Sequence, residues 1–175
     1  RLVCAAYCGA SRALLAGDQA GSVLAWHLPQ ALLSQSTAEA MAPAPSLACT
    51  TLLPQLHGTT PVSYVQATGR GTFASGGRDG SLARLQASVS GDCDGDGGGK
   101  VVCCGTERPP GISAVSFDAA LPGGRVTAGF HASDFLLLGA GATQLLRVAC
   151  GGLRRTHTLH ITAPDAATFA YYHDH

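Results

Sequence analysis

Acidic side chains gather most densely in one short run, where Asp92, Asp94 and Asp96 are followed by Gly97. Carboxylates at the first, third and fifth places, with glycine at the sixth, are how an EF-hand calcium loop begins. Such a loop also needs a glutamate at its twelfth place, which is Cys103 here, and a helix on each side. The run is therefore better interpreted as a flexible acidic insert than as a calcium site.

Histidine and cysteine, the usual zinc ligands, lack the spacing that a zinc site needs. His157 and His160 stand three residues apart on an expected strand, which places them on opposite faces. The adjacent Cys103 and Cys104 also face opposite ways, and the sequence has no Cys-x-x-Cys pair. We therefore expect no metal site.

Motifs for covalent catalysis and phosphate binding are missing from the sequence as well. There is no Gly-x-Ser-x-Gly nucleophile motif and no P-loop. The glycine run at 95–99 opens no helix, so it is not a phosphate cradle. We expect a protein that is not an enzyme and that binds no cofactor.

The composition excludes further classes of protein. Eleven basic and eleven acidic residues give a net charge of zero, without the basic excess of an autonomous nucleic-acid binder. No apolar run reaches the roughly 18 residues of a membrane-spanning helix, so no membrane partner is expected. Seven cysteines without disulfide-like spacing favour reduced thiols in a cytosolic or nuclear protein, and of these two locations we expect the cytoplasm.

The elements that must carry these side chains are short strands. Apolar residues come in brief runs or in alternation, interrupted by Gly, Asp and Pro, and the helix period is almost absent. This pattern predicts an all-β fold. The expected strands cover residues 13–17, 22–28, 46–53, 61–67, 71–76, 81–86, 101–104, 111–117, 124–129, 134–138, 143–149, 157–161 and 167–172.

A repeat runs through these strands. The Gly-Ser-Val-Leu-Ala-Trp sequence at 21–26 corresponds to Gly-Ser-Leu-Ala-Arg-Leu at 80–85, and each follows a tight turn that contains an aspartate. A third copy aligns at 135–138, and a fourth begins at 168–172. Without two low-complexity inserts, residues 30–45 and 91–99, the spacings become about 43 and 44 residues, which is the period of a WD blade. Both inserts are expected to be surface loops.

The period predicts a WD40 β-propeller. Residues 1–175 hold about three blades, fewer than the usual 4–8, so we expect a partial propeller that is a fragment of a larger ring. A β-sandwich is the alternative, but it would not explain a matched period.

From His57 onward the sequence resembles the WD-repeat-containing protein 6 family, a part of the WD40 superfamily. The resemblance covers about two thirds of the chain, and residues 1–50 match only the general WD pattern. The matching landmarks are His57-Gly58 with Val62 and Val65, Gly77-Arg-Asp-Gly80, Gly129-Phe-His-Ala132 with Phe135, Cys150-Gly-Gly152 and Phe169-Ala-Tyr171.

The resemblance implies a non-catalytic scaffold. Members of this family bind a separate SAM-dependent methyltransferase and tRNA, and so support 2′-O-methylation of the ribose at the tRNA wobble position. The alternative is a generic WD40 scaffold for other protein partners.

Two groups of residues are candidates for function. The residues that match the general WD pattern are Asp18, Trp26, His57 and Asp79, and in many WD blades a His–Asp pair such as His57 with Asp79 links strands through buried hydrogen bonds. The candidate contacts with a partner or RNA are Arg78, His131, Arg154 and Arg155. The alternative for this second group is that they are ordinary turn residues and solvated surface charges.

Overall fold

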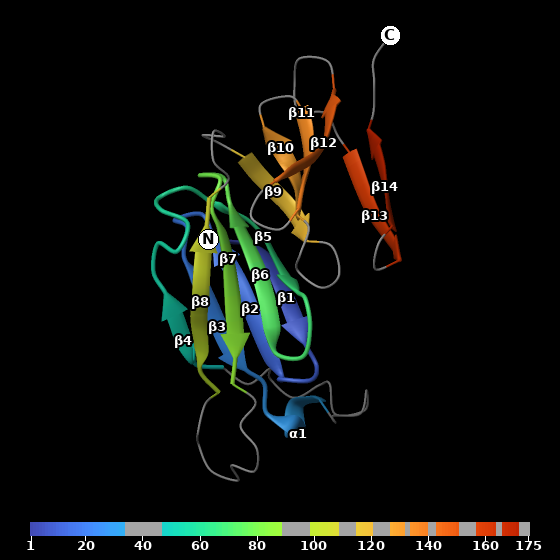
Figure 1. Ribbon diagram of the computed structural model, residues 1–175. Coiled ribbons are helices and arrows are strands. Elements are labelled where there is room, and N and C mark those ends of the chain that lie inside the picture. Colours follow the sequence, from blue (N-terminus) through green and yellow to red (C-terminus); the bar gives the residue numbers. More distant parts are fainter. Residues whose placement is uncertain are drawn as a thin grey trace.

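The computed structural model describes residues 1–33, 47–88, 99–108, 115–120, 127–131, 134–139, 143–150, 157–163 and 166–171. Within these ranges the chain forms antiparallel strands and one short helix, α1 (Gln30–Leu33) (Figure 1). No helix in this part of the chain is long and apolar enough to cross a membrane.

The strands form consecutive four-stranded sheets, each a meander in which neighbours in sequence are neighbours in space. Blade 1 contains β1 (Leu2–Cys8), β2 (Ala13–Asp18), β3 (Val23–His27) and β4 (Thr51–Leu53). Blade 2 contains β5 (Val62–Ala67), β6 (Thr72–Gly77), β7 (Leu82–Ala87) and β8 (Val101–Glu107). Blade 3 contains β9 (Val115–Ala120), β10 (Thr127–His131), β11 (Asp134–Leu138) and β12 (Gln144–Ala149). A two-stranded sheet of β13 (His157–Ala163) and β14 (Ala166–Tyr171) follows.

The sheets pack face to face, and the apolar cores lie between them. Blades 1 and 2 enclose a cluster that includes Leu15, Val23, Phe73 and Leu85. Between blades 2 and 3, Tyr64 and Ala74 meet Leu136 and Leu138. Phe130 and Phe135 of blade 3 pack with Phe169 of β14. This is the layered packing of a partial β-propeller, and it confirms the predicted all-β fold.

The repeat found in the sequence corresponds to a structural repeat at the turns between second and third strands. The Asp18 amide donates to the Ser22 carbonyl at 3.0 Å, and the Gly77 amide donates to the Ser81 carbonyl at the same distance. The next-to-last residue of each turn, Gly21 or Gly80, has φ of +81°. This left-handed backbone favours glycine and explains why both turns contain one there.

Two strand predictions need correction. β1 was not predicted, although it pairs with β2 from Leu2 to Cys8. The strand expected at 46–53 is only three residues long, Thr51–Leu53, and the Thr50 amide and hydroxyl both donate to the Ala25 carbonyl just before it.

The two predicted inserts fall between the third and fourth strands of their blades. At their described ends the inserts depart from the predicted exposed loops, because helix α1 occupies the first four residues of the 30–45 insert and Gly99, the last residue of the 91–99 insert, is buried. The rest of both inserts lies outside the described residues, so their loop character stays a prediction.

Candidate functional site

A buried histidine links three segments of blade 2. His57, in the connection between β4 and β5, is fully buried. Its Nδ1 atom lies 2.6 Å from the Ser81 hydroxyl, beside the β6–β7 turn, and its Nε2 atom lies 2.8 Å from the hydroxyl of Ser75 on β6. The backbone amide of His57 also donates to the carbonyl of Gly21 in blade 1 at 2.9 Å, so the same residue ties the two blades together.

The Asp79 carboxylate, at the end of this network, fixes the direction of each hydrogen bond in it. The Ser81 hydroxyl donates to Oδ1 of Asp79 at 2.6 Å, and an ionised carboxylate can only accept. Ser81 must then accept its second bond from the Nδ1–H of His57. This leaves Nε2 without a proton, so it accepts from the Ser75 hydroxyl. The geometry therefore assigns the neutral tautomer with hydrogen on Nδ1.

The protonation equilibria agree with this assignment. Burial lowers the pKa of His57 below its ordinary value, and the negative charge of Asp79 opposes that shift only in part. For Asp79, partial burial acts to raise the pKa, but hydrogen bonds from the hydroxyl and amide of Ser81 and the positive charge of Arg108 lower it overall. The pair is thus a neutral imidazole and a carboxylate at neutral pH.

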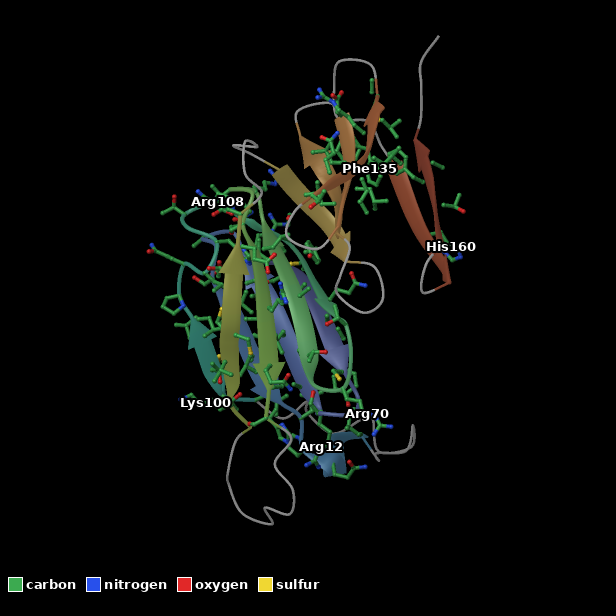
Figure 2. All side chains as sticks on the ribbon, viewed as in Figure 1. Arg12, Arg70, Lys100, Arg108, Phe135 and His160 are labelled. Carbon is green, nitrogen blue, oxygen red and sulfur yellow. The ribbon has the colours of Figure 1, made fainter. Side chains whose placement is uncertain are left out.

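Two arginine side chains are exposed on the surface next to this hydrogen-bond network. Arg108, which follows β8, pairs with the Asp79 carboxylate at 2.8 Å while its own side chain is 60% exposed. Arg78 is exposed in the same β6–β7 turn, where its amide donates to the Pro61 carbonyl at 3.1 Å. We call Arg78, Asp79 and Arg108 the turn surface. Figure 2 shows Arg108 at one end of the blades and Arg12, Arg70 and Lys100 at the opposite end.

The corresponding turn of blade 1 is built differently. Since Ser22 matches Ser81, Asp18 stands in the place of Gly77, and Ala20 stands in the place of Asp79. Asp18 accepts from the amides of Ala20 at 2.9 Å and Ser22 at 2.7 Å, which closes its own turn. The two aspartates grouped by the sequence motif therefore occupy different positions of the repeat.

Of the four remaining predicted residues, the structure describes the side chain of Trp26 alone. Trp26 is half-buried on β3, opposite Leu14 of β2. His131 ends β10, where its backbone pairs with Asp134, and its side chain is not described. Arg154 and Arg155 lie outside the described residues.

Three residues of the site were not predicted. Ser81 could have been found, because it repeats Ser22 after the turn glycine. Ser75 and Arg108 carry no such signal, since only the pairing of β6, β7 and β8 brings them to His57 and Asp79. Among the described residues, no three histidine, cysteine or acidic side chains are grouped as a metal site requires.

Comparison with known proteins supports the fold. The chain is similar to the crystal structure of the β-propeller domain of Cps50 (Swd1) from Myceliophteria thermophila, with a TM-score of 0.56 and 10% sequence identity. The match covers 86% of this chain and 44% of that one, so the chain spans less than half of the neighbour's length. At this identity the likeness shows the propeller fold alone. No protein-family model and no curated protein matches the sequence.

Proposed function

We propose that this chain is a non-catalytic binding module that presents the turn surface to a macromolecular partner. The observation that supports the proposal is that blade 2 shields its proton-transferring residues from solvent but exposes its arginines. The hydrogen-bonded residues that could relay a proton, His57, Ser75 and Ser81, are at least 93% buried, whereas Arg78 and Arg108 are exposed. A substrate cannot reach a sealed imidazole, but a partner can reach the arginines.

The chemistry of the turn surface favours an anionic or carbonyl-rich partner. Guanidinium groups bind carboxylates and phosphates through two parallel hydrogen bonds. Asp79 neutralises part of the charge and holds Arg108 in place, which reduces the side-chain entropy lost on binding. The described part of the site therefore suits an acidic protein segment or an RNA phosphate.

The resemblance to the WD-repeat-containing protein 6 family favours the more specific form of this proposal. In that form the partners are a SAM-dependent methyltransferase and tRNA, the site of action is the wobble ribose, and the complex is cytoplasmic. The ordered landmarks from His57 to Tyr171 support it. A rigid propeller would hold the RNA in register and reduce the entropic barrier to methyl transfer. Since the net charge is zero, other proteins of the complex must supply most of the phosphate binding.

The binding proposal is tested with a matched pair of arginine variants of the full-length protein. Arg78→Ala combined with Arg108→Ala should weaken partner capture about tenfold, the effect of losing roughly 1.4 kcal/mol. Arg147→Ala is the control, because Arg147 is 57% exposed and pairs with Asp134 on blade 3, as Arg108 pairs with Asp79. Equal effects of the double variant and of the Arg147→Ala control would contradict the placement of the site.

The specific form is tested by mapping 2′-O-methylation in cells that lack the protein. We expect loss of methylation at the tRNA wobble position, restored by the wild-type protein, and no binding of SAM to the purified chain. Unchanged methylation would reject the role in tRNA methylation. The proposal of a generic binding scaffold would then remain, and the arginine variants test it separately.

A further inference from the structure

A loop beside the turn surface holds one residue in an unfavourable backbone conformation. Gln55, between β4 and β5, has φ of +49°. Glutamine seldom adopts this left-handed region, whereas asparagine and glycine adopt it more readily. Backbone strain of this kind persists only where the surrounding structure fixes it, and it is concentrated at functional sites.

Three hydrogen bonds hold the loop in this conformation. The Gln55 amide donates to the hydroxyl of Ser22 at 3.1 Å, and the Gln55 carbonyl accepts from the Gly58 amide at 3.0 Å. The His57 amide donates to the carbonyl of Gly21 at 2.9 Å. Two of these bonds reach the β2–β3 turn, so the loop is fixed to blade 1.

The fixed backbone leaves the Gln55 side chain in solvent. Leu56, the next residue, packs against the core between blades 1 and 2, whereas Gln55 is exposed. Among the described residues, the side-chain amide of Gln55 forms no hydrogen bond. The side chain therefore adds no hydrogen bond to this part of the fold that would offset the strain, and its N–H and C=O groups are open to a partner.

Gln55 lies next to the turn surface. Gly58, which closes the same loop turn, is exposed, and a Cβ atom added to it would lie 3.8 Å from Oδ2 of Asp79. That carboxylate oxygen pairs with the guanidinium of Arg108 at 2.8 Å. The Gln55 amide therefore extends the surface that presents Arg78 and Arg108.

The charges of this surface favour a peptide over RNA. Asp79 is only 15% exposed, and the Ser81 hydroxyl and Arg108 hold its carboxylate in place. Two arginines and one aspartate leave one net positive charge, whereas the affinity for RNA grows with the number of phosphates that cations neutralise. A peptide main chain offers N–H and C=O groups side by side, and these match the C=O and N–H groups of the Gln55 amide.

We infer that Gln55 is a recognition residue that pairs with the main chain of an acidic peptide segment, while carboxylates of that segment bind the exposed guanidinium groups of Arg78 and Arg108. The inference rests on the binding role proposed above and names the partner that the site accepts. Since the strained backbone fixes the direction of the Cα–Cβ bond before the partner arrives, less conformational freedom is lost on binding.

The test measures binding and stability of the full-length protein together. The probes are a short peptide of alternating glutamate and glycine, the same peptide with N-methyl groups on its glycines, and an oligouridylate RNA of similar length. All three are fluorescently labelled, and binding is followed by anisotropy. We expect the unmodified peptide to bind best. N-methylation, which removes main-chain donors, should weaken binding about tenfold, and so should Gln55→Gly.

Gln55→Gly also separates recognition from structural support. A purely structural role predicts a lower midpoint of thermal unfolding, whereas recognition predicts weaker peptide binding with an unchanged or higher midpoint, because glycine relieves the strain. Gln55→Asn keeps an amide and tolerates the left-handed backbone, so it should retain part of the affinity. Gln144→Ala, at an exposed glutamine of β12 in blade 3, is the control and should bind the peptide as the wild type does.

The arginine double variant separates this inference from the proposed function. If the oligouridylate binds at least as tightly as the peptide, and Arg78→Ala with Arg108→Ala abolishes that binding, the proposed function holds but the inference is overturned. Peptide binding that Gln55→Gly leaves unchanged, a lowered unfolding midpoint in that variant, or no measurable peptide binding also overturns the inference. Peptide binding that the arginine double variant leaves unchanged contradicts the proposed function itself.

Discussion

His57 and Asp79 are joined through one hydroxyl, that of Ser81, which lies 2.6 Å from the imidazole Nδ1 atom and 2.6 Å from the carboxylate. The link connects the loop before β5, the β6–β7 turn and, through Ser75, the centre of β6. It therefore fixes the turn surface to the core of blade 2.

Ser81 should contribute more to stability than its counterpart in blade 1. Ser81→Ala leaves the Nδ1–H of His57 buried without an acceptor, and should lower the free energy of unfolding by about 2–3 kcal/mol. Ser22→Ala is a matched control, because Ser22 is 8% exposed against 7% for Ser81. Among the described residues its hydroxyl accepts from the Gln55 amide, so about 1 kcal/mol is expected. Chemical denaturation of both variants measures the difference in unfolding free energy. Equal losses would show that the hydrogen bond between His57 and Ser81 adds no stability.

Stability should fall with acid because of His57. Its pKa in the folded protein lies below the ordinary value of 6.5, so the unfolded chain binds the proton first. The contribution is full above pH 6.5 and is lost as pH falls toward the lower folded pKa. The lowered pKa of Asp79 adds a loss of the same sign, below its ordinary value of 3.8.

The His57 contribution can be isolated by comparing slopes. His57→Gln should flatten the plot of unfolding free energy against pH just below pH 6.5, whatever its absolute stability. His27→Gln is the control, because burial and the charge of Arg12 also lower the pKa of His27. If His57→Gln keeps the wild-type slope, the imidazole is not the titrating group.

Close packing between blades 1 and 2 depends on a glycine without a positive φ. A Cβ atom added at Gly17 would lie 2.5 Å from the Cβ of Val62 and 2.9 Å from the sulfur of Cys4. Gly17→Ala should therefore destabilise the chain by about 1–3 kcal/mol through overpacking. Gly105→Ala, on β8, meets nothing within 4 Å and should change stability by less than about 0.5 kcal/mol. Comparable thermal unfolding of the two variants would contradict this tight contact.

The sequence predicts the sheets better than the contacts between them. Turn residues identify β2 and β3, and within β3 the buried Val23 and Ala25 alternate with less buried neighbours. β1 was not predicted from the sequence because its Cys-Ala-Ala centre consists of weak strand formers and its apolar side chains do not alternate with polar ones. Its strand conformation comes from pairing with β2, a tertiary effect.

The functional residues, too, are only partly predictable from local sequence patterns. The turn motif locates Asp79, but it also groups Asp18 with it, and only the backbone pairing reveals that Asp18 takes the place of Gly77. The hydrogen bond between Gln55 and Ser22 spans 33 residues. No local pattern encodes that contact, because the loop after β4 meets the β2–β3 turn only in the folded chain.

The 91–99 insert should be dispensable for folding. The Ser88 amide donates to the Lys100 carbonyl at 2.9 Å, and the Lys100 amide donates to the Ser88 hydroxyl at the same distance, which closes the base of the connection. Deleting residues 91–98 should change the unfolding free energy by less than about 1 kcal/mol, since loop closure depends only weakly on length. Loss of the folded circular-dichroism spectrum on deletion would show that the segment is part of the core.

Phe169 should couple the β13–β14 sheet to blade 3. Its ring stacks on Phe135 with centroids 3.8 Å apart and an angle of 15° between the planes, and the Phe130 ring lies 6.1 Å away. Phe169→Ala removes the aromatic contact between the sheets, at about 1–3 kcal/mol, and should speed hydrogen exchange at the amides of β10 and β11. Leu146→Ala, on the neighbouring β12, is the control, because that side chain is 48% exposed and should change exchange little. If β10 and β11 exchange at the wild-type rate in the Phe169 variant, the stack does not hold the sheets together, and the β13–β14 pair must be stabilised by other contacts.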